Sequence, residues 1–181
     1  MNLKYNTIVL AGAALLMAAG NASAAQEDLQ STTNASAICQ GVRPSDNSQL
    51  SFRALQVENV GNQTALVSCA FPTIRDQGQA DNRIVNYFGA FFTNATGRNA
   101  TVTCTGVQGF ANGEDNVYET QSAMVLRSNF PGTATTGYIF FGPASATDPL
   151  YYQNVSMTCQ IPVGVSIADT YVGYKLDDAP N

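Results

Sequence analysis

The stretch Val155–Val163, VSMTCQIPV, decides the fold of this chain. Apolar and polar side chains alternate in it, with Val155, Met157, Cys159, Ile161 and Val163 on one face and Ser156, Thr158 and Gln160 on the other. A period of two residues is typical of a β-strand with one buried and one solvent-facing side. Stretches around Cys69 and Cys104 repeat the pattern. The sequence therefore predicts β-structure in which core-facing strand positions carry cysteines.

The N-terminal residues have the features of a secretory signal peptide. Met1–Asn6 carries one positive charge, Lys4, and the apolar run Thr7–Ala19 follows. Ala22-Ser23-Ala24 then supplies the small side chains of a cleavage site. The run of 13 residues is shorter than the roughly 20 needed to cross a bilayer. We therefore expect residues 1–24 to be removed from a bacterial periplasmic or extracellular protein, and no membrane span in the mature chain.

Eight segments between turn signals are predicted to be strands. They are Ser51–Asn59, Thr64–Phe71, Arg83–Thr93, Ala100–Val107, Val117–Arg127, Gly137–Phe141, Leu150–Val163 and Thr170–Leu176. No segment has a convincing helical period. We expect an all-β fold, a single antiparallel β-sandwich with immunoglobulin-like or jelly-roll topology, over residues 38–176. Residues 25–37 are predicted to be a flexible N-terminal tail, and 177–181 a polar tail.

The segment Arg83–Thr93 is the most apolar of the eight. Its alternation predicts one face with Ile84, Phe88, Ala90 and Phe92, and another with Val85, Tyr87 and Phe91. Apolar residues on both faces indicate a central strand that is covered on its outer side as well.

Four cysteines, an even number in an exported chain, predict two disulfides. Their spacing contains no C-x-x-C metal or redox motif. Three connectivities are open. Cys104 and Cys159 both lie mid-strand on predicted buried faces, which favours joining them, and Cys39 would then pair with Cys69.

Charge and composition exclude several classes of function. The chain has 8 basic and 13 acidic residues, and its basic residues do not cluster. It therefore lacks the electrostatic footprint of a nucleic-acid-binding protein. It also contains no histidine, which excludes Ser-His-Asp and Cys-His catalysis and histidine-ligated metals.

Carboxylates are the remaining candidates for catalysis and for metal binding. Glu58 and Glu119 are the strand-borne pair that a glycan hydrolase would need, although solvated surface charges explain them more simply. Two loops carry oxygen ligands suited to calcium, namely Asp76, Asp81 and Asn82 in one and Glu114, Asp115 and Asn116 in the other. Neither loop has EF-hand spacing. We expect no catalytic residue, metal or cofactor.

Aromatic residues are expected mostly in the core, with one exception. Tyr151 and Tyr152 are adjacent, so one of them must face away from the side that buries the other. An exposed tyrosine there is a candidate contact for a glycan or protein ligand.

Three short motifs resemble those of a group of small exported bacterial proteins of unknown function. They are the strand end Cys69–Asp76, similar to C-P-x-x-R-D but with Ala-Phe inserted before Pro72, the V-x-C strand Val102–Cys104, and the C-x-I-P strand Cys159–Pro162. The resemblance implies a β-sandwich with disulfides, and it implies no activity and no site.

The leading hypothesis is a non-catalytic exported protein with a binding or surface-structural role and an unknown protein or glycan ligand. A fimbrial or coat subunit assembled by strand donation is the alternative. Such a subunit needs an alternating apolar donor segment, whereas Gln26–Ala37 offers only Leu29. A carboxylate-dependent glycan hydrolase is the third hypothesis.

Overall fold

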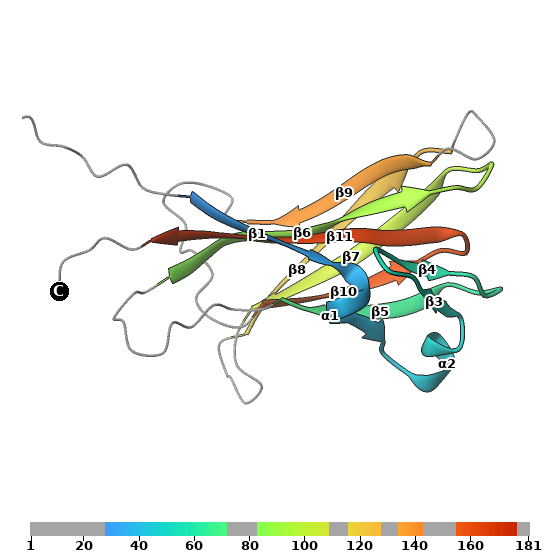
Figure 1. The fold of residues 1–181 in the computed structure, drawn as a ribbon, viewed down its shortest axis with the longest axis horizontal. Coiled ribbons are helices and arrows are strands. Elements are labelled where there is room, and N and C mark those ends of the chain that lie inside the picture. The colour runs from blue at the N-terminus through green and yellow to red at the C-terminus, as the bar shows by residue number, and fades with distance from the viewer. Residues whose placement is uncertain (1–27, 72–82, 109–115, 128–133, 143–154, 177–181) are drawn as a thin grey trace, which may run out of the picture.

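The computed structural model describes residues 28–71, 83–108, 116–127, 134–142 and 155–176, and these form an all-β fold with two short helices (Figure 1). The elements are β1 (Asp28–Asn34), α1 (Ala35–Ile38), β2 (Cys39–Gly41), α2 (Pro44–Asn47), β3 (Leu50–Phe52), β4 (Val57–Asn59), β5 (Ala65–Ala70), β6 (Arg83–Asn94), β7 (Ala100–Gln108), β8 (Val117–Val125), β9 (Thr135–Phe141), β10 (Val155–Ile161) and β11 (Val165–Leu176).

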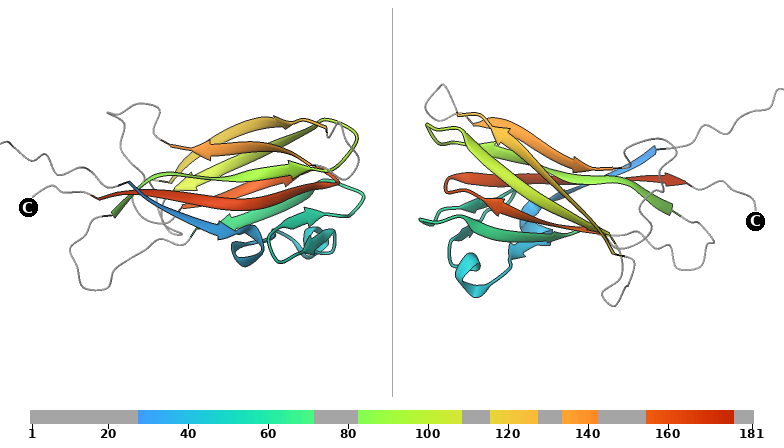
Figure 2. Two further views of the ribbon diagram at one scale, coloured as in Figure 1. Left: turned by 45° about the horizontal axis from the view of Figure 1, so that its top comes forward. Right: turned by 180° about the vertical axis from the view of Figure 1, so that it is seen from behind.

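The strands form two antiparallel sheets that face each other across one core (Figure 2). We call them sheet A, with the order β3-β4-β11-β6-β9 and β1 also paired to β11, and sheet B, with the order β2-β5-β10-β7-β8. Four consecutive strands of sheet A have the order β4-β11-β6-β9, and four of sheet B have the order β5-β10-β7-β8. Strands at the same place in the two orders are neighbours in sequence, as β4 and β5 are. These eight strands therefore have the order of a jelly roll. Of the two predicted topologies, the structure therefore has the jelly-roll one.

The core is built by the inward positions of both sheets. β10 alternates as predicted, with Met157, Cys159 and Ile161 fully buried and Gln160 exposed. Phe88, Phe92 and Phe141 are among the largest fully buried side chains. Burying an aromatic side chain of this size contributes about 1.5–3 kcal/mol to stability.

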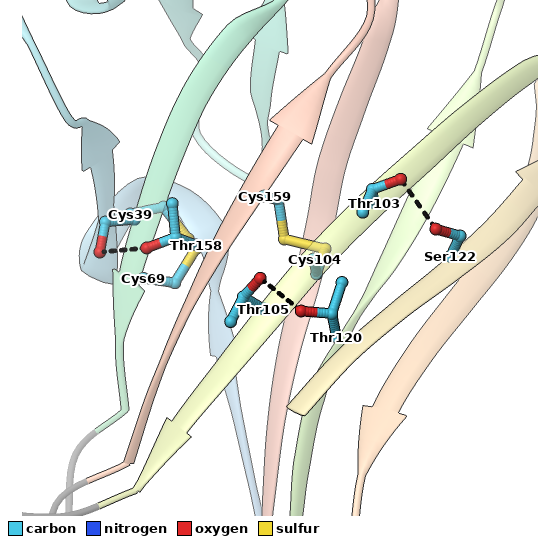
Figure 3. Close-up of a disulfide and its surroundings, with 10 residues drawn as sticks. Cys39, Cys69, Thr103, Cys104, Thr105, Thr120, Ser122, Thr158 and Cys159 are labelled. Carbon is cyan, nitrogen blue, oxygen red and sulfur yellow. Dashed lines mark hydrogen bonds between the residues drawn. A yellow bond between two sulfur atoms is a disulfide. The ribbon is translucent and has the colours of Figure 1, made fainter. Parts of the chain in front are cut away.

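Both predicted disulfides are present, Cys39–Cys69 and Cys104–Cys159 (Figure 3). In each, the two cysteines lie directly opposite each other on neighbouring strands of sheet B. Within the described parts of the chain, no cysteine is free.

The prediction of a flexible N-terminal tail over residues 25–37 is wrong for most of these residues. Residues 28–34 form β1, which pairs with β11 from Asp28 opposite Lys175 to Asn34 opposite Asp169. The segment lacks apolar alternation because backbone hydrogen bonds to β11, rather than a deeply buried face, hold it in the sheet. Residues 25–27 and 177–181 lie outside the described residues.

The single strand predicted over Ser51–Asn59 is two strands of a hairpin. Phe52 pairs with Val57, and the N–H of Arg53 donates to the carbonyl of Gln56 at 2.9 Å. Leu55 lies in this turn and is 65% exposed. A turn of four residues preserves the period of two, so alternation alone cannot reveal it.

A β-bulge changes the predicted faces of β6. Tyr87 pairs with Gly173, but the next pair on β11 is Val85 with Tyr174, so Asn86 is an extra residue. Val85 is therefore buried on the same side as Phe88 instead of facing outward with Tyr87.

Val163 is predicted to lie on the buried face of its strand. It is 44% exposed because β10 ends at Ile161.

Candidate functional site

Five aromatic side chains gather on the outer side of sheet A. They come from the three adjacent strands β11, β6 and β9, which lie side by side in Figures 1 and 2. We call this group the aromatic face, and it consists of Tyr87, Phe91, Tyr138, Phe140 and Tyr171. Tyr138 is 64% exposed and the other four are half-buried, because the rings cover one another.

Strand register brings these rings together. Phe91 on β6 lies opposite Tyr138 on β9. Two pairs along the ladder, Gly89 has Phe140 on one side and Tyr171 on the other. A Cβ atom at Gly89 would lie 2.1 Å from the carbonyl oxygen of Ile139 and 2.5 Å from the Phe140 ring. Glycine at this position is thus required for the close approach. The gap that it leaves is bridged by Phe140 and Tyr171, whose ring centroids are 6.0 Å apart.

A second glycine seats the fifth ring. A Cβ atom at Gly173 would lie 2.2 Å from Cε1 of Tyr87, so the Tyr87 ring rests on bare backbone of β11. Tyr87 also contacts Phe140 edge to face, with ring centroids 6.1 Å apart. The result is a continuous patch of rings over three strands.

The rings are held by contacts with one another. Phe91 lies at the centre, with ring centroids 4.9 Å from Tyr171, 5.5 Å from Phe140 and 6.0 Å from Tyr138. Most of these contacts are edge-to-face, the arrangement that aromatic pairs favour. Tyr138 and Phe140, on the edge strand β9, are tilted by only 37° to each other. These two rings present a paired apolar surface at the margin of the sheet.

Polar groups lie beside the rings on the same outer side. The next row across the sheet contains Glu58, Ser166 and Thr93, paired in that order on β4, β11 and β6. Nη2 of Arg53 lies 2.7 Å from Oε2 of Glu58. This contact balances the charge of the carboxylate, although its angles do not make a hydrogen bond. Ser166 is buried, so the row offers the hydroxyl of Thr93 and one compensated ion pair next to the aromatic face.

The outer side of sheet B differs, because it carries small hydroxyl side chains. Thr103 is hydrogen-bonded to Ser122 at 2.8 Å and Thr105 to Thr120 at 2.9 Å, in both cases across β7 and β8 (Figure 3). Tyr118 on β8 is 65% exposed. Sheet B's described outer side therefore has an exposed tyrosine but no cluster of rings.

The two candidate catalytic carboxylates are not brought together. Glu58 lies on the outer side of β4 in sheet A, whereas Glu119 on β8 faces the inner side of sheet B, where it lies beside Phe88 and Phe141 and accepts a hydrogen bond from Gln121 at 2.6 Å. β4 and β9, the strand that β8 faces, are three strand spacings apart, about 14 Å. A glycosidase pair needs roughly 5–10 Å. The prediction that these two residues could form a hydrolase site is wrong.

Other sequence candidates fall outside the described residues. These are Tyr151 and Tyr152, and the calcium candidates Asp76, Asp81, Asn82, Glu114 and Asp115. Among the described residues, no group of three or more cysteine or acidic side chains is placed to hold a metal ion. Nor is any described helix long and apolar enough to cross a membrane.

Together, the strand order and the outer aromatic cluster define a disulfide-bonded jelly-roll β-sandwich with one aromatic outer side. Protein-family models give no match to the sequence. Curated proteins give no significant match either. Among solved structures, the chain is similar to one described as "CBM4 structure and function", with a TM-score of 0.34 and 10% identity over 82% of this chain and 86% of that chain. At these values the similarity carries no argument about ligand or site.

Proposed function

We propose that this is an exported, non-catalytic protein that binds a glycan through the aromatic face. The observation that supports this proposal is the continuous patch of five rings on the solvent side of sheet A, with Tyr138 64% exposed. Isolated apolar side chains on a surface are ordinary, but a contiguous aromatic patch marks an interaction site. Oxidised cysteines fit export to an oxidising compartment.

The chemistry around the rings favours a neutral glycan over other ligands. The C–H groups on one side of a pyranose ring pack on aromatic rings, and its hydroxyls need nearby hydrogen-bonding groups. Thr93 supplies a hydroxyl in the adjacent row, and Arg53 and Glu58 supply a donor and an acceptor that balance each other's charge. An anionic ligand would call for unpaired cations, and the described part of this face does not cluster them.

A glycan array followed by calorimetric titration tests the proposal. We expect the Tyr138→Ala variant to bind the best glycan at least about tenfold more weakly, a loss of about 1.4 kcal/mol. Tyr118→Ala is the matched control, because Tyr118 is equally exposed on the outer side of sheet B, and it should bind as the unmodified protein does. A blank array, or equal losses in both variants, would overturn the proposal.

Strand donation stays as a second candidate because residues 28–34 do form a sheet strand. β1 pairs with β11 of its own chain, which is the position a donated strand would occupy in an assembled subunit. Deleting residues 28–34 and adding the peptide DLQSTTN gives a direct test. Restored stability together with SDS-resistant ladders of the full chain would support donation, and failure of the peptide to bind would exclude it.

A further inference from the structure

We propose that two copies of this chain pair antiparallel through the edge strand β9, so that sheet A continues from one copy into the other. The pairing itself is independent of the proposed function. Its consequence for ligand binding, two aromatic faces joined into one longer face, rests on the proposed glycan binding.

β9 differs from the other described edge strands. An edge strand carries unpaired N–H and C=O groups, and proteins protect such edges by keeping them short or charged. β2 and β3 have three residues each. β1 begins with Asp28, and β8 carries Glu119. β9 has seven residues, Thr135–Phe141, with no charge and no proline.

The backbone of β9 is available for a partner. Within the described structure, β9 pairs with β6 along all seven residues and with no strand on its other side. Every second residue of an edge strand directs its N–H and C=O away from its neighbour. These groups can form a ladder with an antiparallel copy of the same strand.

A two-fold axis through Tyr138 pairs the whole strand with itself. Thr135 then lies opposite Phe141 of the second copy, Thr136 opposite Phe140, and Tyr138 opposite its own copy. The residues on the outer side, Thr136, Tyr138 and Phe140, meet a neutral or aromatic partner at each position, so no like charges are opposed. Such an isologous contact closes at two copies.

Joining the copies would extend the aromatic face. Tyr138 and Phe140 are the rings nearest the β9 edge, and the paired copies would place a second Tyr138 beside the first. A long glycan could then contact both aromatic faces at once. Two linked sites bind a repeating ligand far more tightly than one site does, typically by 10²–10⁴-fold.

Sedimentation velocity over a range of concentrations tests the pairing. We expect a reversible monomer–dimer equilibrium in the unmodified protein. Thr136→Lys leaves the five rings in place but puts a charge on the edge, and it should give only monomer. Ser122→Lys, which adds the same charge at an exposed position on β8, should still dimerise. Monomer at all concentrations, open-ended assembly, or equal effects of the two variants would overturn the inference.

Ligand measurements separate this inference from the proposed function. A dimer that binds no glycan on the array would leave the pairing intact and remove the proposed function. A protein that stays monomeric but binds glycan would remove the pairing and leave the proposed function intact. If both hold, Thr136→Lys should bind a short oligosaccharide as the unmodified protein does, and an immobilised polysaccharide at least tenfold more weakly. If the variant and the unmodified protein bind the polysaccharide equally, the idea that the two aromatic faces act as one is excluded.

Discussion

Two buried asparagines, Asn59 and Asn94, close corners where the chain passes from sheet A to sheet B. Both are fully buried. The side-chain Nδ2 of Asn59 donates to the carbonyls of Gln63 at 2.7 Å and Ile161 at 2.8 Å. Its Oδ1 accepts from the N–H of Gly61 at 3.0 Å. One side chain thus forms hydrogen bonds with two backbone groups of its own corner and with the last carbonyl of β10.

Asn94 repeats the same arrangement at the next corner. Its Nδ2 donates to the carbonyls of Arg98 at 2.9 Å and Val125 at 3.0 Å, and its Oδ1 accepts from the N–H of Thr96 at 2.9 Å. An amide is needed because only this side chain combines two N–H donors with an acceptor in so small a volume.

We predict that Asn94→Ala lowers the free energy of unfolding by about 2–4 kcal/mol, because two carbonyls lose their donor and one of them is buried. Asn94→Asp should be at least as harmful, since a carboxylate would face two carbonyl oxygens. Urea denaturation measures both. Asn62→Ala, at an exposed position in the other corner, is the control and should change stability by less than about 0.5 kcal/mol. Equal effects of Asn94→Ala and Asn62→Ala would contradict the role of the corner amide.

The buried carboxylate of Asp46 joins α2 to sheet B. It accepts hydrogen bonds from Nε of Arg43 at 2.8 Å and from the N–H of Leu66 on β5 at 3.2 Å. The hydrogen bond from the Arg43 side chain is the main reason that the pKa of Asp46 lies below its ordinary 3.8, and it outweighs the opposing effect of burial.

This shift predicts a pH dependence of stability. A carboxyl whose pKa is lower in the folded state stabilises the fold fully above its unfolded value, and that stabilisation is lost as pH falls through the folded pKa. Below pH 3.8, the unmodified protein should therefore lose stability more steeply than Asp46→Asn. Urea midpoints measured from neutral to acid pH check this, and parallel curves would contradict it.

At the scale of elements, the two disulfides reinforce strand pairs that already exist. Each joins residues opposite each other within sheet B, so neither links the two sheets. The Cys104–Cys159 bond closes the longer loop, 55 residues against 30. In the chain-entropy model, these loops correspond to about 4.2 and 3.6 kcal/mol of stabilisation.

We predict that Cys104→Ala with Cys159→Ala remains folded but is less stable by about 2–4 kcal/mol. The β10–β7 ladder holds the same strands together without the sulfur atoms. Far-ultraviolet circular dichroism and urea unfolding of the double variant test this. Loss of the β-sheet spectrum in water would show that the bond is needed to form the fold.

At the scale of the whole molecule, the two outer sides differ in chemistry. Sheet A presents rings, while sheet B presents paired hydroxyls such as Thr103 with Ser122. Only 12% of the residues are charged, and the net charge is −5. Binding at sheet A should thus depend on ring contacts and neutral hydrogen bonds rather than on long-range attraction.

Glycan affinity should accordingly be almost independent of salt. Between about 0.05 M and about 0.5 M NaCl, we expect the dissociation constant to change by less than about twofold, because screening acts on exposed charges. Calorimetric titration at the two concentrations measures this. A loss of tenfold or more at high salt would indicate a charged ligand instead.

Local patterns in the sequence were sufficient for the strands with one buried side. The alternation around Cys69 and Cys159 predicts β5 and β10 and their buried residues, and the even number of cysteines predicts two bonds. The alternation can be seen within a single segment, and the number of cysteines can be counted without knowing the fold. Neither feature depends on which strands pair.

Tertiary structure alone decided the rest. The turn after Phe52 does not interrupt the alternation, so the sequence does not reveal it. The extra residue Asn86 shifts the alternation of β6 without a local signal. β1 is a strand only because β11 lies beside it. The aromatic face arises in the same way. Phe91 and Tyr171 are far apart in sequence and meet because β6 pairs with β11 in one register. The alternation within one strand tells which face is buried, but it does not tell which distant strand lies beside it, because register is set by the patterns of both paired strands together.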